Sequence, residues 1–438
     1  MKISLVEPKS PFYNFYSFLL KKQPLLGPIY LGTMLKNQGH DVTIYNENIK
    51  EIDYARLNDS DVLGISIMTS TAPRGYEIAN NFRKVNPKGK VIIGGSHATF
   101  LPEEAAQFAD LVVTGEGEPV ISDVIEMLKD GGANTNIVSG RPVENLDDLP
   151  FPDFSLIDGF KKRLRVTPVS TSRGCPFDCT FCSVTAMFGR KYRFRSTESV
   201  IEELSRLEHR HVFFYDDSFD ANKPRLKTLL SEMIRRKLTP PWTSQVRVDV
   251  AKDEELVKLI ARSNCSELCI GFESTDPEVL KSYNKKQTPD DVMKCIEVLH
   301  KHGIRVHGMF ISDGYFNYDK LGIDSLQLCI LVPILGTKLY AKVKDAKQFL
   351  IGKFPTDWKL FDGGHVVHWP DKMSPFELQR QTMQATRKFY SRQKAAKMLL
   401  MGRWTDFRIR LGGNIIMRKW EAQNKDYLAK LKEIRMPT

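Results

Sequence analysis

The sequence predicts an α/β protein with a doubly wound parallel sheet at the N-terminus, a partial parallel β/α barrel after it, and a mostly helical C-terminal region. Strand and helix patterns alternate in two long series, a proline-rich break separates these series, and a basic stretch with helical periodicity follows the second. Such alternation is typical of parallel sheets covered by helices. We therefore divide the chain into residues 1–140, a linker at 141–165, a barrel at 166–345 and a C-terminal region at 346–438.

Composition limits the classes of protein to which the chain can belong. Its 438 residues suffice for two or three domains, and 42% apolar residues support a large core rather than disorder. Seven cysteines, an odd number, in a long charged chain do not suggest a secreted disulfide framework, so we expect a reducing cytoplasm. The sequence shows neither a signal peptide nor an apolar run that would span a bilayer. The net charge of +11 permits anionic partners such as nucleic acid, acidic lipid or phosphorylated substrates without selecting one.

The first series predicts a sheet whose strand ends are polar or glycine-rich. Strand patterns lie at 2–8, 41–47, 61–70, 90–99 and 110–118, and helix patterns at 27–39, 71–87 and 119–131. Ligands of doubly wound sheets bind beyond the carboxyl ends of the strands. Here those ends include Thr69-Ser70, Gly94-Gly95-Ser96-His97 and Gly115-Glu116. Glycines let a large flat or phosphate-bearing ligand approach the backbone closely. A dinucleotide site is only weakly indicated, because no G-x-G-x-x-G precedes a helix.

The second series predicts the barrel. Strand patterns lie at 165–172, 211–219, 242–250, 267–274, 304–312 and 324–333, with helix patterns at 196–207, 225–237, 253–263 and 288–303. Ser196 is expected to cap the first of these helices. Polar residues gather just after the strands, where active sites of barrels lie. The connection at 312–324 departs from this pattern, because it is barely long enough for a parallel crossover and has no amphipathic helix. We expect the barrel to be shortened or irregular there.

The C-terminal region combines an irregular segment with helix patterns. Ser374 is the expected cap of a helix that has Pro375 at its first position. The basic and aromatic stretch that follows is expected to form helices packed on the barrel. A lid over the barrel and an amphipathic surface that touches acidic lipid are the alternatives. Nucleic-acid binding is not expected, because no recognised binding module accompanies the positive charge.

The first barrel strand runs into the segment STSRGCPFDCTFCSV, residues 170–184, which places Cys175, Cys179 and Cys182 at C-x3-C-x2-C spacing. A structural zinc site needs four ligands, and the sequence has no second C-x2-C and no H-x3-H. Three thiolates suit a [4Fe–4S] cluster with one open iron, to which a substrate or cofactor can bind. The remaining cysteines are expected to pack in the core: Cys265, Cys269, Cys295 and Cys329.

The loop RGCPFDCTFCSV resembles the signature of the radical S-adenosylmethionine (radical SAM) superfamily, including the Gly-Cys-Pro start and the aromatic Phe181 before the last cysteine. The resemblance implies that the three cysteines ligate the cluster and that the amine and carboxylate of S-adenosylmethionine chelate the fourth iron. It also implies reductive cleavage of that cofactor to a 5′-deoxyadenosyl radical, with a flavodoxin- or ferredoxin-type protein as electron donor.

The N-terminal segments GHDVTIYNE, GGSHATFLPEEA and VVTGEGE resemble the cobalamin-binding domain of one large radical SAM subfamily. The D-x-H-x-x-G motif, whose histidine ligates cobalt in mutase-type domains, is absent. His97 could replace that ligand, but we expect it to hydrogen-bond the loop or the corrin side chains. The resemblance implies that these residues bind cobalamin: Thr69, Ser70, Gly94, Gly95, Ser96, His97, Gly115 and Glu116.

Three strand ends of the barrel resemble the S-adenosylmethionine pocket of the family. In FYDDSF, the residues Asp216, Asp217 and Ser218 would receive the amino group of the cofactor. Arg247 would pair with its carboxylate through a bidentate, charge-assisted contact, and Glu273 would contact the ribose or an amine. A scaffold salt bridge or a strand cap is the alternative role for each. A nearby basic run would bind an anionic substrate or form a solvated face: Arg190, Lys191, Arg193 and Arg195.

Together these features predict a cytoplasmic, cobalamin-dependent radical SAM enzyme. The resemblance implies a C-methyltransferase that uses methylcobalamin to methylate an unactivated carbon of a small-molecule or lipid-like natural product. A ring-forming or oxidative cyclase is one alternative. A catalytically impaired protein that binds an iron–sulfur cluster and cobalamin is another, because residues 312–324 shorten the barrel. Peripheral contact with a membrane is left open as a further property.

Overall fold

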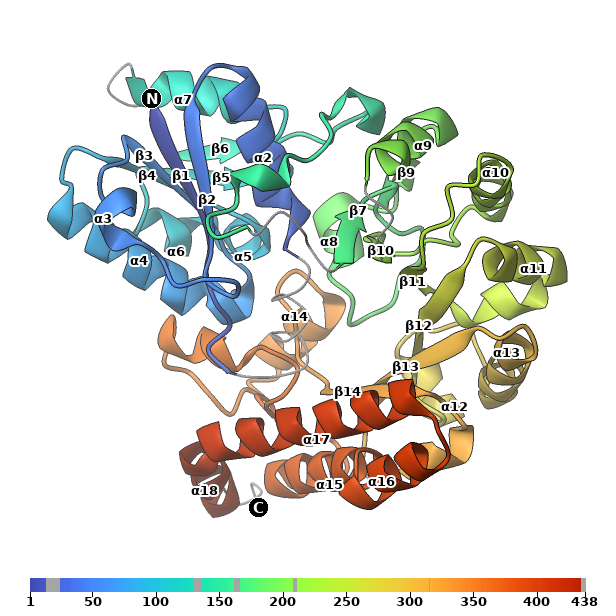
Figure 1. The fold of residues 1–438 in the computed structure, drawn as a ribbon. Coiled ribbons are helices and arrows are strands. Elements are labelled where there is room, and N and C mark those ends of the chain that lie inside the picture. The colour runs from blue at the N-terminus through green and yellow to red at the C-terminus, as the bar shows by residue number, and fades with distance from the viewer. Residues whose placement is uncertain (13–23, 130–135, 161–165, 208–210, 315, 435–438) are drawn as a thin grey trace.

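The computed structural model describes residues 1–12, 24–129, 136–160, 166–207, 211–314 and 316–434. It contains two six-stranded parallel sheets, one small antiparallel ribbon and a helical C-terminal region. Figure 1 shows the first sheet with its helices in blue and cyan, and the second sheet in green through yellow to orange beside it. The orange and red C-terminal helices lie below both sheets in the same view. This architecture confirms the predicted fold class.

The first sheet has the strand order β2-β1-β3-β4-β5-β6, and all its pairings are parallel. Its strands are β1 (Lys2–Glu7), β2 (Asp41–Asn46), β3 (Val62–Ser66), β4 (Lys90–Gly94), β5 (Leu111–Thr114) and β6 (Ile137–Ser139). The first five match predicted strands. The sequence did not predict β6, because its three residues are only partly buried at the sheet edge and carry no alternating pattern.

Helices cover both faces of the first sheet, as expected for a doubly wound fold. One face packs under α2 and α7, where Ile29 and Val124 join Ile44 in a buried cluster. The other face packs under α4, where Tyr76 and Ile78 are buried. These elements are α2 (Leu26–Asn37), α3 (Tyr54–Leu57), η1 (Thr69–Thr71), α4 (Ala72–Val85), α5 (Ser96–Phe100), α6 (Pro102–Ala106) and α7 (Ile121–Lys129). Residues 130 and 131 of the predicted helix 119–131 lie outside the described part of the chain.

The strand predicted at 90–99 is too long. β4 ends at Gly94, and Gly95 has a φ of +97° in a conformation that only glycine adopts easily. A Cβ at Gly95 would lie 2.5 Å from the carbonyl oxygen of Ile67, so a side chain is excluded there. The chain turns at this position, and the helix α5 begins at Ser96.

The predicted linker packs on the first sheet. It contains η2 (Leu146–Asp148) and η3 (Phe154–Leu156). The amide of Asp158 donates to the carbonyl of Ile44 at 2.8 Å, and the amide of Asp153 donates to the hydroxyl of Thr33 at 2.9 Å. The described part of the linker is therefore fixed to the N-terminal domain, and residues 161–165 lie outside the described part.

The second sheet is the partial barrel, with the parallel strand order β14-β13-β12-β11-β10-β7. Its strands are β7 (Val166–Val169), β10 (His211–Phe214), β11 (Trp242–Val246), β12 (Cys265–Glu273), β13 (Arg305–Ser312) and β14 (Ser325–Ile330). Its outer elements are α9 (Thr197–Arg206), α10 (Lys223–Arg235), η4 (Val248–Lys252), α11 (Glu254–Arg262), α12 (Pro277–Ser282) and α13 (Pro289–Lys301). The expected cap of α9 is confirmed, because the Ser196 hydroxyl accepts from the Ser199 amide at 3.1 Å.

The crossover from β13 to β14 contains only η5 (Tyr318–Leu321) among its described residues, which confirms the predicted lack of a crossover α-helix. The two strands still pair in register from His307–Ser325 to Ser312–Ile330. The C-terminal chain covers this part of the sheet, because Phe389 and Tyr390 belong to the same buried cluster as the barrel strands. The Tyr390 hydroxyl accepts from the amide of Leu326 at 2.8 Å and donates to its carbonyl at 2.6 Å. The C-terminal helices thus supply the packing that a crossover helix would have supplied.

The C-terminal region consists of α14 (Lys338–Asp345), η6 (Thr356–Leu360), α15 (Pro375–Phe389), α16 (Arg392–Leu400), α17 (Trp404–Gln423) and α18 (Lys425–Glu433). Ser374 caps α15 as predicted, in a capping box with Glu377. η6 packs against η1 and α4 of the first domain. Within the described part of the chain, no helix is both long and apolar enough to cross a membrane.

Candidate functional site

A cavity of about 500 Å³ lies where the strand ends of the first sheet face the cysteine loop of the barrel. Its first wall comes from β1, β3, β4 and β5, including their carboxyl ends, together with α2 and α7. Its second wall includes Ser170, Ser172 and Asp217 and the short helix α8 (Val184–Phe188). Apolar side chains line most of this space. Such a cavity between two domains, with a few polar groups, is the usual form of a cofactor or substrate site.

Five of the eight residues predicted to bind cobalamin line this cavity: Gly94, Gly95, Ser96, Gly115 and Glu116. A Cβ at the neighbouring Gly117 would lie 3.6 Å from Val113 and 3.7 Å from Leu31, both of which also line the cavity. A side chain at Gly117 would therefore fill part of the space. The glycines at these strand ends leave room for a flat ligand, which fits a corrin ring.

The other three of these predicted residues lie away from the cavity. Thr69 and Ser70 belong to η1, which packs against η6 of the C-terminal region. His97 is fully buried behind the cavity wall, and its Nε2 lies 3.0 Å from Glu104. Its ring makes an edge contact with Trp358 at 5.4 Å. The prediction placed His97 next to the ligand because it follows Gly95, but α5 begins at Ser96 and turns the imidazole toward the C-terminal region.

Cys175, Cys179 and Cys182 lie on one loop between β8 (Ser172–Arg173) and α8, and all three are free thiols of intermediate exposure. Burial raises the pKa of Cys182 to about 12 and also raises the pKa of Cys175, although backbone amides of Val184 and Phe177 donate to these sulfurs. Iron binding would release the thiol protons. The donor set therefore fits a cluster held by thiolates with hydrogen bonds to sulfur.

The described residues contain no group of three His, Cys, Asp or Glu side chains that converges on a single ion. A tetrahedral zinc site would require such convergence. In a four-iron cluster each thiolate binds a different iron, so the sulfurs stand further apart. The cluster assignment therefore rests on the C-x3-C-x2-C spacing of the loop.

Backbone contacts hold the cysteine loop against the barrel. The Thr180 amide donates to the carbonyl of Tyr283 at 3.1 Å, and its carbonyl accepts from the Leu339 amide at 3.2 Å. Asn284 donates to the carbonyl of Asp178 at 2.8 Å. Phe181 makes an edge contact with Tyr283 at 5.2 Å. These partners were not predicted, because they lie more than a hundred residues from the loop in sequence.

The acidic residues that follow β10 have different positions: Asp216 supports the backbone, and Asp217 lines the cavity. Asp216 is buried and accepts from the Thr171 amide at 2.7 Å, the Ser172 amide at 3.0 Å and the Thr171 hydroxyl at 2.5 Å. It therefore fixes the backbone that leads into the cysteine loop. Asp217 accepts from the Gly174 amide at 2.9 Å and lines the cavity, where burial raises its pKa to about 6. Ser218 is buried against Asp220 at 3.2 Å.

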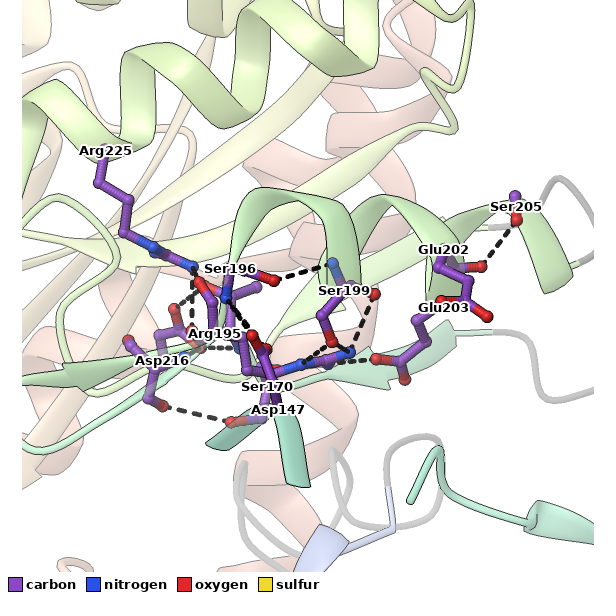
Figure 2. A network of polar contacts seen from close by, with 12 residues as sticks. Asp147, Ser170, Arg195, Ser196, Ser199, Glu202, Glu203, Ser205, Asp216 and Arg225 are labelled. Atoms are coloured by element: carbon purple, nitrogen blue, oxygen red, sulfur yellow. Dashed lines mark hydrogen bonds and ion pairs between the residues drawn. The ribbon is translucent and has the colours of Figure 1, made fainter. Parts of the chain in front are cut away.

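Figure 2 shows the polar network that surrounds Asp216. Arg195 donates to the carbonyl of Ser170 at 3.0 Å and forms a buried ion pair with Glu203 on α9. Arg225 donates to the carbonyl of Thr171 at 2.9 Å. Much of the backbone from β7 to the cysteine loop is therefore tied to its neighbours by hydrogen bonds.

Arg247 and Glu273, the other predicted S-adenosylmethionine contacts, have partners within the chain. The Arg247 guanidinium stacks on Phe177 of the cysteine loop at 3.8 Å and lies 3.4 Å from Asp249. Arg247 is not among the residues that line the main cavity. Glu273 forms a largely buried ion pair with Lys285 at 2.8 Å and has a φ of +62°, which marks a strained strand end. The structure brings Arg247 to the cysteine loop but does not bring Glu273 to the cavity.

An ion cluster joins the two domains beside the cavity. Arg173, two residues before Cys175, donates to Glu116 at 2.8 Å and to Glu118 at 2.5 Å. Arg193 of β9 (Arg193–Phe194) pairs with Glu116 and also donates to the carbonyl of Val143 at 2.6 Å. The sequence suggested a basic run that either binds an anionic substrate or forms a solvated face, but two of its members are buried: Arg193 in this cluster and Arg195 beside α9. Glu116 is therefore a partner of arginines as well as a residue of the cavity wall.

Comparisons with known proteins agree with this geometry. The radical SAM superfamily model matches residues 169–320, and the B12 binding domain model matches residues 23–125. An uncharacterized methyltransferase of Pyrococcus horikoshii is 31% identical over 358 residues, which cover 72% of this chain and 78% of that protein. The bacteriochlorophyllide d C-12(1)-methyltransferase of Chlorobaculum tepidum is 26% identical, with coverage of 88% and 86%.

A solved structure has the same fold at low sequence identity. The cobalamin-dependent S-adenosylmethionine radical enzyme OxsB, determined with aqua-cobalamin and S-adenosylmethionine bound, superimposes with a TM-score of 0.68 at 15% identity. The match covers 100% of this chain and 82% of that one. It supports the arrangement of two parallel sheets with a helical C-terminal region.

Proposed function

The chain belongs to the cobalamin-dependent branch of the radical SAM superfamily, and we propose that it methylates an unactivated carbon of a large apolar natural product. It is an enzyme whose cofactors are a [4Fe–4S] cluster, S-adenosylmethionine and cobalamin. The observation that carries the proposal is the cavity itself. The strand ends of the B12 binding domain form one wall, and the segment around the cysteine loop forms the other.

Cys175, Cys179 and Cys182 are the proposed cluster ligands. When bound there, the cluster would supply the electron for cleavage of S-adenosylmethionine, and cobalamin would supply the methyl group. The chain's own contribution is to fix the loop: Asp216 holds the backbone on one side, and the Thr180 backbone bonds hold it on the other. Arg247 stacked on Phe177 closes the outside of the loop.

Asp217 is the residue that we propose for the amino group of S-adenosylmethionine. It is the member of the Asp216–Ser218 group that lines the cavity, and its carboxylate lies next to the cysteine loop through Gly174. A bound ammonium group would favour the ionised carboxylate and so oppose the effect of burial on its pKa. For Arg247 to bind the carboxylate of S-adenosylmethionine, it would have to leave Asp249. For Glu273 to contact the ribose, it would have to leave Lys285.

Gly94, Gly95, Ser96 and Gly115 are the proposed contacts to the corrin. Their strand ends present backbone groups and no bulky side chain to the cavity, which lets a flat ring lie against them. His97 is proposed as a support behind this wall, because Glu104 and Trp358 hold its ring. This arrangement provides no histidine ligand for cobalt from that loop.

A large ring or lipid-like molecule is the proposed substrate, and a flavodoxin- or ferredoxin-type protein is the proposed electron donor. The relative from Chlorobaculum tepidum, named for a bacteriochlorophyllide, supports a substrate of this size. The apolar side chains of α8 on the wall opposite the proposed corrin contacts support an apolar substrate: Val184, Met187 and Phe188. Exposed Arg190 and Lys191 beside the cysteine loop would suit an acidic electron donor.

The proposed function can be tested with the full chain after anaerobic reconstitution with iron, sulfide and cobalamin. The protein would be reduced with dithionite and given S-adenosylmethionine with a trideuterated methyl group, with bacteriochlorophyllide d as the probe. We expect 5′-deoxyadenosine, S-adenosylhomocysteine and a trideuteromethyl group in the probe by mass spectrometry. A probe that loses hydrogen without gaining the label would indicate a cyclase or oxidase instead.

The matched controls are Cys182→Ala, which should abolish 5′-deoxyadenosine, and Cys295→Ala, which should leave it unchanged. Cys295 lies buried on α13, away from the loop. Formation of 5′-deoxyadenosine without labelled probe would reject this substrate class but leave the radical chemistry intact. No 5′-deoxyadenosine from a protein that holds its full iron would contradict the proposed function as a whole.

A further inference from the structure

Exposed apolar side chains concentrate at one place on the surface, the turn between α16 and α17 and the outer face of α17. Of the eleven large hydrophobic residues exposed in the described chain, four lie within residues 400–415: Leu400, Met401, Trp404 and Ile415. Leu400 is 88% exposed and Trp404 is 64% exposed. A concentration of this kind marks an interaction surface more often than an ordinary solvated face.

The periodicity of α17 places these residues on one side of the helix. Trp404, Arg408, Leu411 and Ile415 follow one another at intervals of three or four residues, so they share a face. The opposite face packs on the protein through Asp406, Ile416 and Trp420. Most surface helices carry polar side chains on the side away from the core. α17 carries apolar side chains on both sides, so its outer face has the composition of a surface that is in contact with another apolar surface.

The charge around this face is strongly positive. Residues 387–425 contain eleven Lys or Arg and two Asp or Glu, a net charge of +9 out of +11 for the whole chain. Acids outside this segment pair with some of these cations: Asp319 pairs with Lys394 and Arg410, and Asp324 lies 4.0 Å from Arg403. The two acids are already paired, Asp406 with Arg403 and Arg305, and Glu421 with Arg387. Lys397, Arg408 and Arg418 are exposed, and within the described residues no acidic side chain pairs with them. Figure 1 shows α17 running the length of the C-terminal region, from α16 to α18.

We propose that the α16–α17 turn and the outer face of α17 bind the surface of an anionic lipid bilayer. Leu400, Trp404 and Ile415 would enter the interface between headgroups and acyl chains, where Trp is favoured. Lys397, Arg408 and Arg418 would remain at the depth of the headgroups, where long basic side chains reach anionic phosphates. Exposed apolar side chains next to exposed basic ones favour an acidic membrane, because a bilayer places acyl chains directly beside anionic headgroups.

The test is sedimentation of the full chain with vesicles of phosphatidylcholine alone or with about 30% phosphatidylglycerol. We expect binding to the anionic vesicles, little binding to the neutral ones, and a strong decrease of binding at about 0.5 M salt. The combined variant Leu400→Ser, Trp404→Ser and Ile415→Ser should reduce the partition coefficient at least about tenfold. The combined variant Lys397→Glu, Arg408→Glu and Arg418→Glu should remove the preference for anionic lipid.

A matched control carries the same kinds of change on α4 and the residues after it, where Val85 is 64% exposed. The control combines Lys84→Glu, Val85→Ser and Lys88→Glu and should bind vesicles like the parent. Equal binding by the parent and both α16–α17 variants would overturn the proposal. A parent protein that does not bind vesicles would also overturn it. If light scattering then shows a dimer of the parent that the serine variant dissociates, the face binds a second copy of the chain instead of lipid.

Discussion

The Glu116→Gln substitution removes the central acid of the ion cluster that joins the two walls of the cavity. Glu116 accepts from Arg173 at 2.8 Å, from the Val143 amide at 3.1 Å and from both terminal nitrogens of Arg193. Its side chain is 6% exposed, and that of Arg193 is 8% exposed. Glutamine keeps one oxygen acceptor but places an NH₂ group next to the arginine donors. The buried charge of Arg193 is then left without an acidic partner.

The size of the effect follows from burial. Removing one partner of a buried pair costs about 3–5 kcal/mol, because a charge is left without compensation. Arg173 retains Glu118, and Arg193 retains the carbonyl of Val143. We therefore expect the lower end, a loss of about 3 kcal/mol in the free energy of unfolding. The exposed pair Glu126–Lys129 provides the matched control, since Glu126→Gln should cost less than about 0.5 kcal/mol.

The pH dependence gives this prediction a second readout. Burial by itself would raise the pKa of Glu116, but the hydrogen bond from Arg193 and the charge of Arg173 outweigh it and hold the pKa below its usual value of 4.5. A carboxyl with a lowered pKa stabilises the fold above its unfolded-state pKa, and this contribution disappears as the pH falls through the folded-state pKa. The difference between parent and Glu116→Gln should therefore be full near neutral pH and shrink below pH 4.5.

Urea titration followed by tryptophan fluorescence measures both effects, and the corrin retained after gel filtration reports on the cavity. We expect Glu116→Gln to retain less cobalamin than Glu126→Gln, because the two walls of the cavity lose a common anchor. A free energy of unfolding within about 0.5 kcal/mol of the parent, the range expected for exposed pairs, would refute the reasoning.

Three further predictions address other parts of the chain. Burial raises the pKa of Glu7 to about 8, so the free energy of unfolding of the parent should decrease by about 1.4 kcal/mol for each unit by which the pH rises from 4.5 to 8. Glu7→Gln should remove that slope in urea titrations. Tyr390→Phe leaves the amide and carbonyl of Leu326 without their hydroxyl partner and should cost about 2–3 kcal/mol. The exposed Tyr54→Phe, which loses only the hydrogen bond from Arg74, should cost no more than about 1 kcal/mol. His97→Ala should keep most of its cobalamin, measured by corrin absorbance, because the ring lies behind the cavity wall.

Each of these outcomes can fail in a recognisable way. An unchanged pH slope in Glu7→Gln would mean that another group sets it. A Tyr390→Phe variant as stable as the Tyr54→Phe control would show that the C-terminal helices do not support β14. Loss of corrin from His97→Ala together with a changed cobalt spectrum would make His97 a ligand.

The sequence predicted what is local in the chain. Alternating strand and helix patterns were enough to locate both sheets, and the spacing of Cys175, Cys179 and Cys182 was enough to indicate a cluster loop. Contacts between distant segments could not be predicted in this way. Arg173 gave no signal as a partner of Glu116, because 57 residues separate them.

The differences between the expected and the observed positions have the same physical origin. His97 follows two glycines at a strand end, so the pattern favoured the cavity, but the positive φ of Gly95 and the start of α5 rotate it away. The short crossover at 312–324 suggested damage to the barrel, yet Tyr390 and Phe389 supply the missing packing from the C-terminal region. Compensation of this kind depends on tertiary contacts that no local window of sequence contains.

The most direct test of the account is the magnetic interaction between the two metal centres of the reconstituted protein. Electron paramagnetic resonance would be recorded on cobalt(II) cobalamin in the full chain, before and after reduction of the cluster. If the cobalamin-binding strand ends and the cysteine loop share one cavity, the cobalt signal should relax faster once the cluster is reduced. A variant with Cys175→Ala, Cys179→Ala and Cys182→Ala should show no such change. A cobalt signal that relaxes identically with oxidised and reduced cluster would contradict the shared cavity.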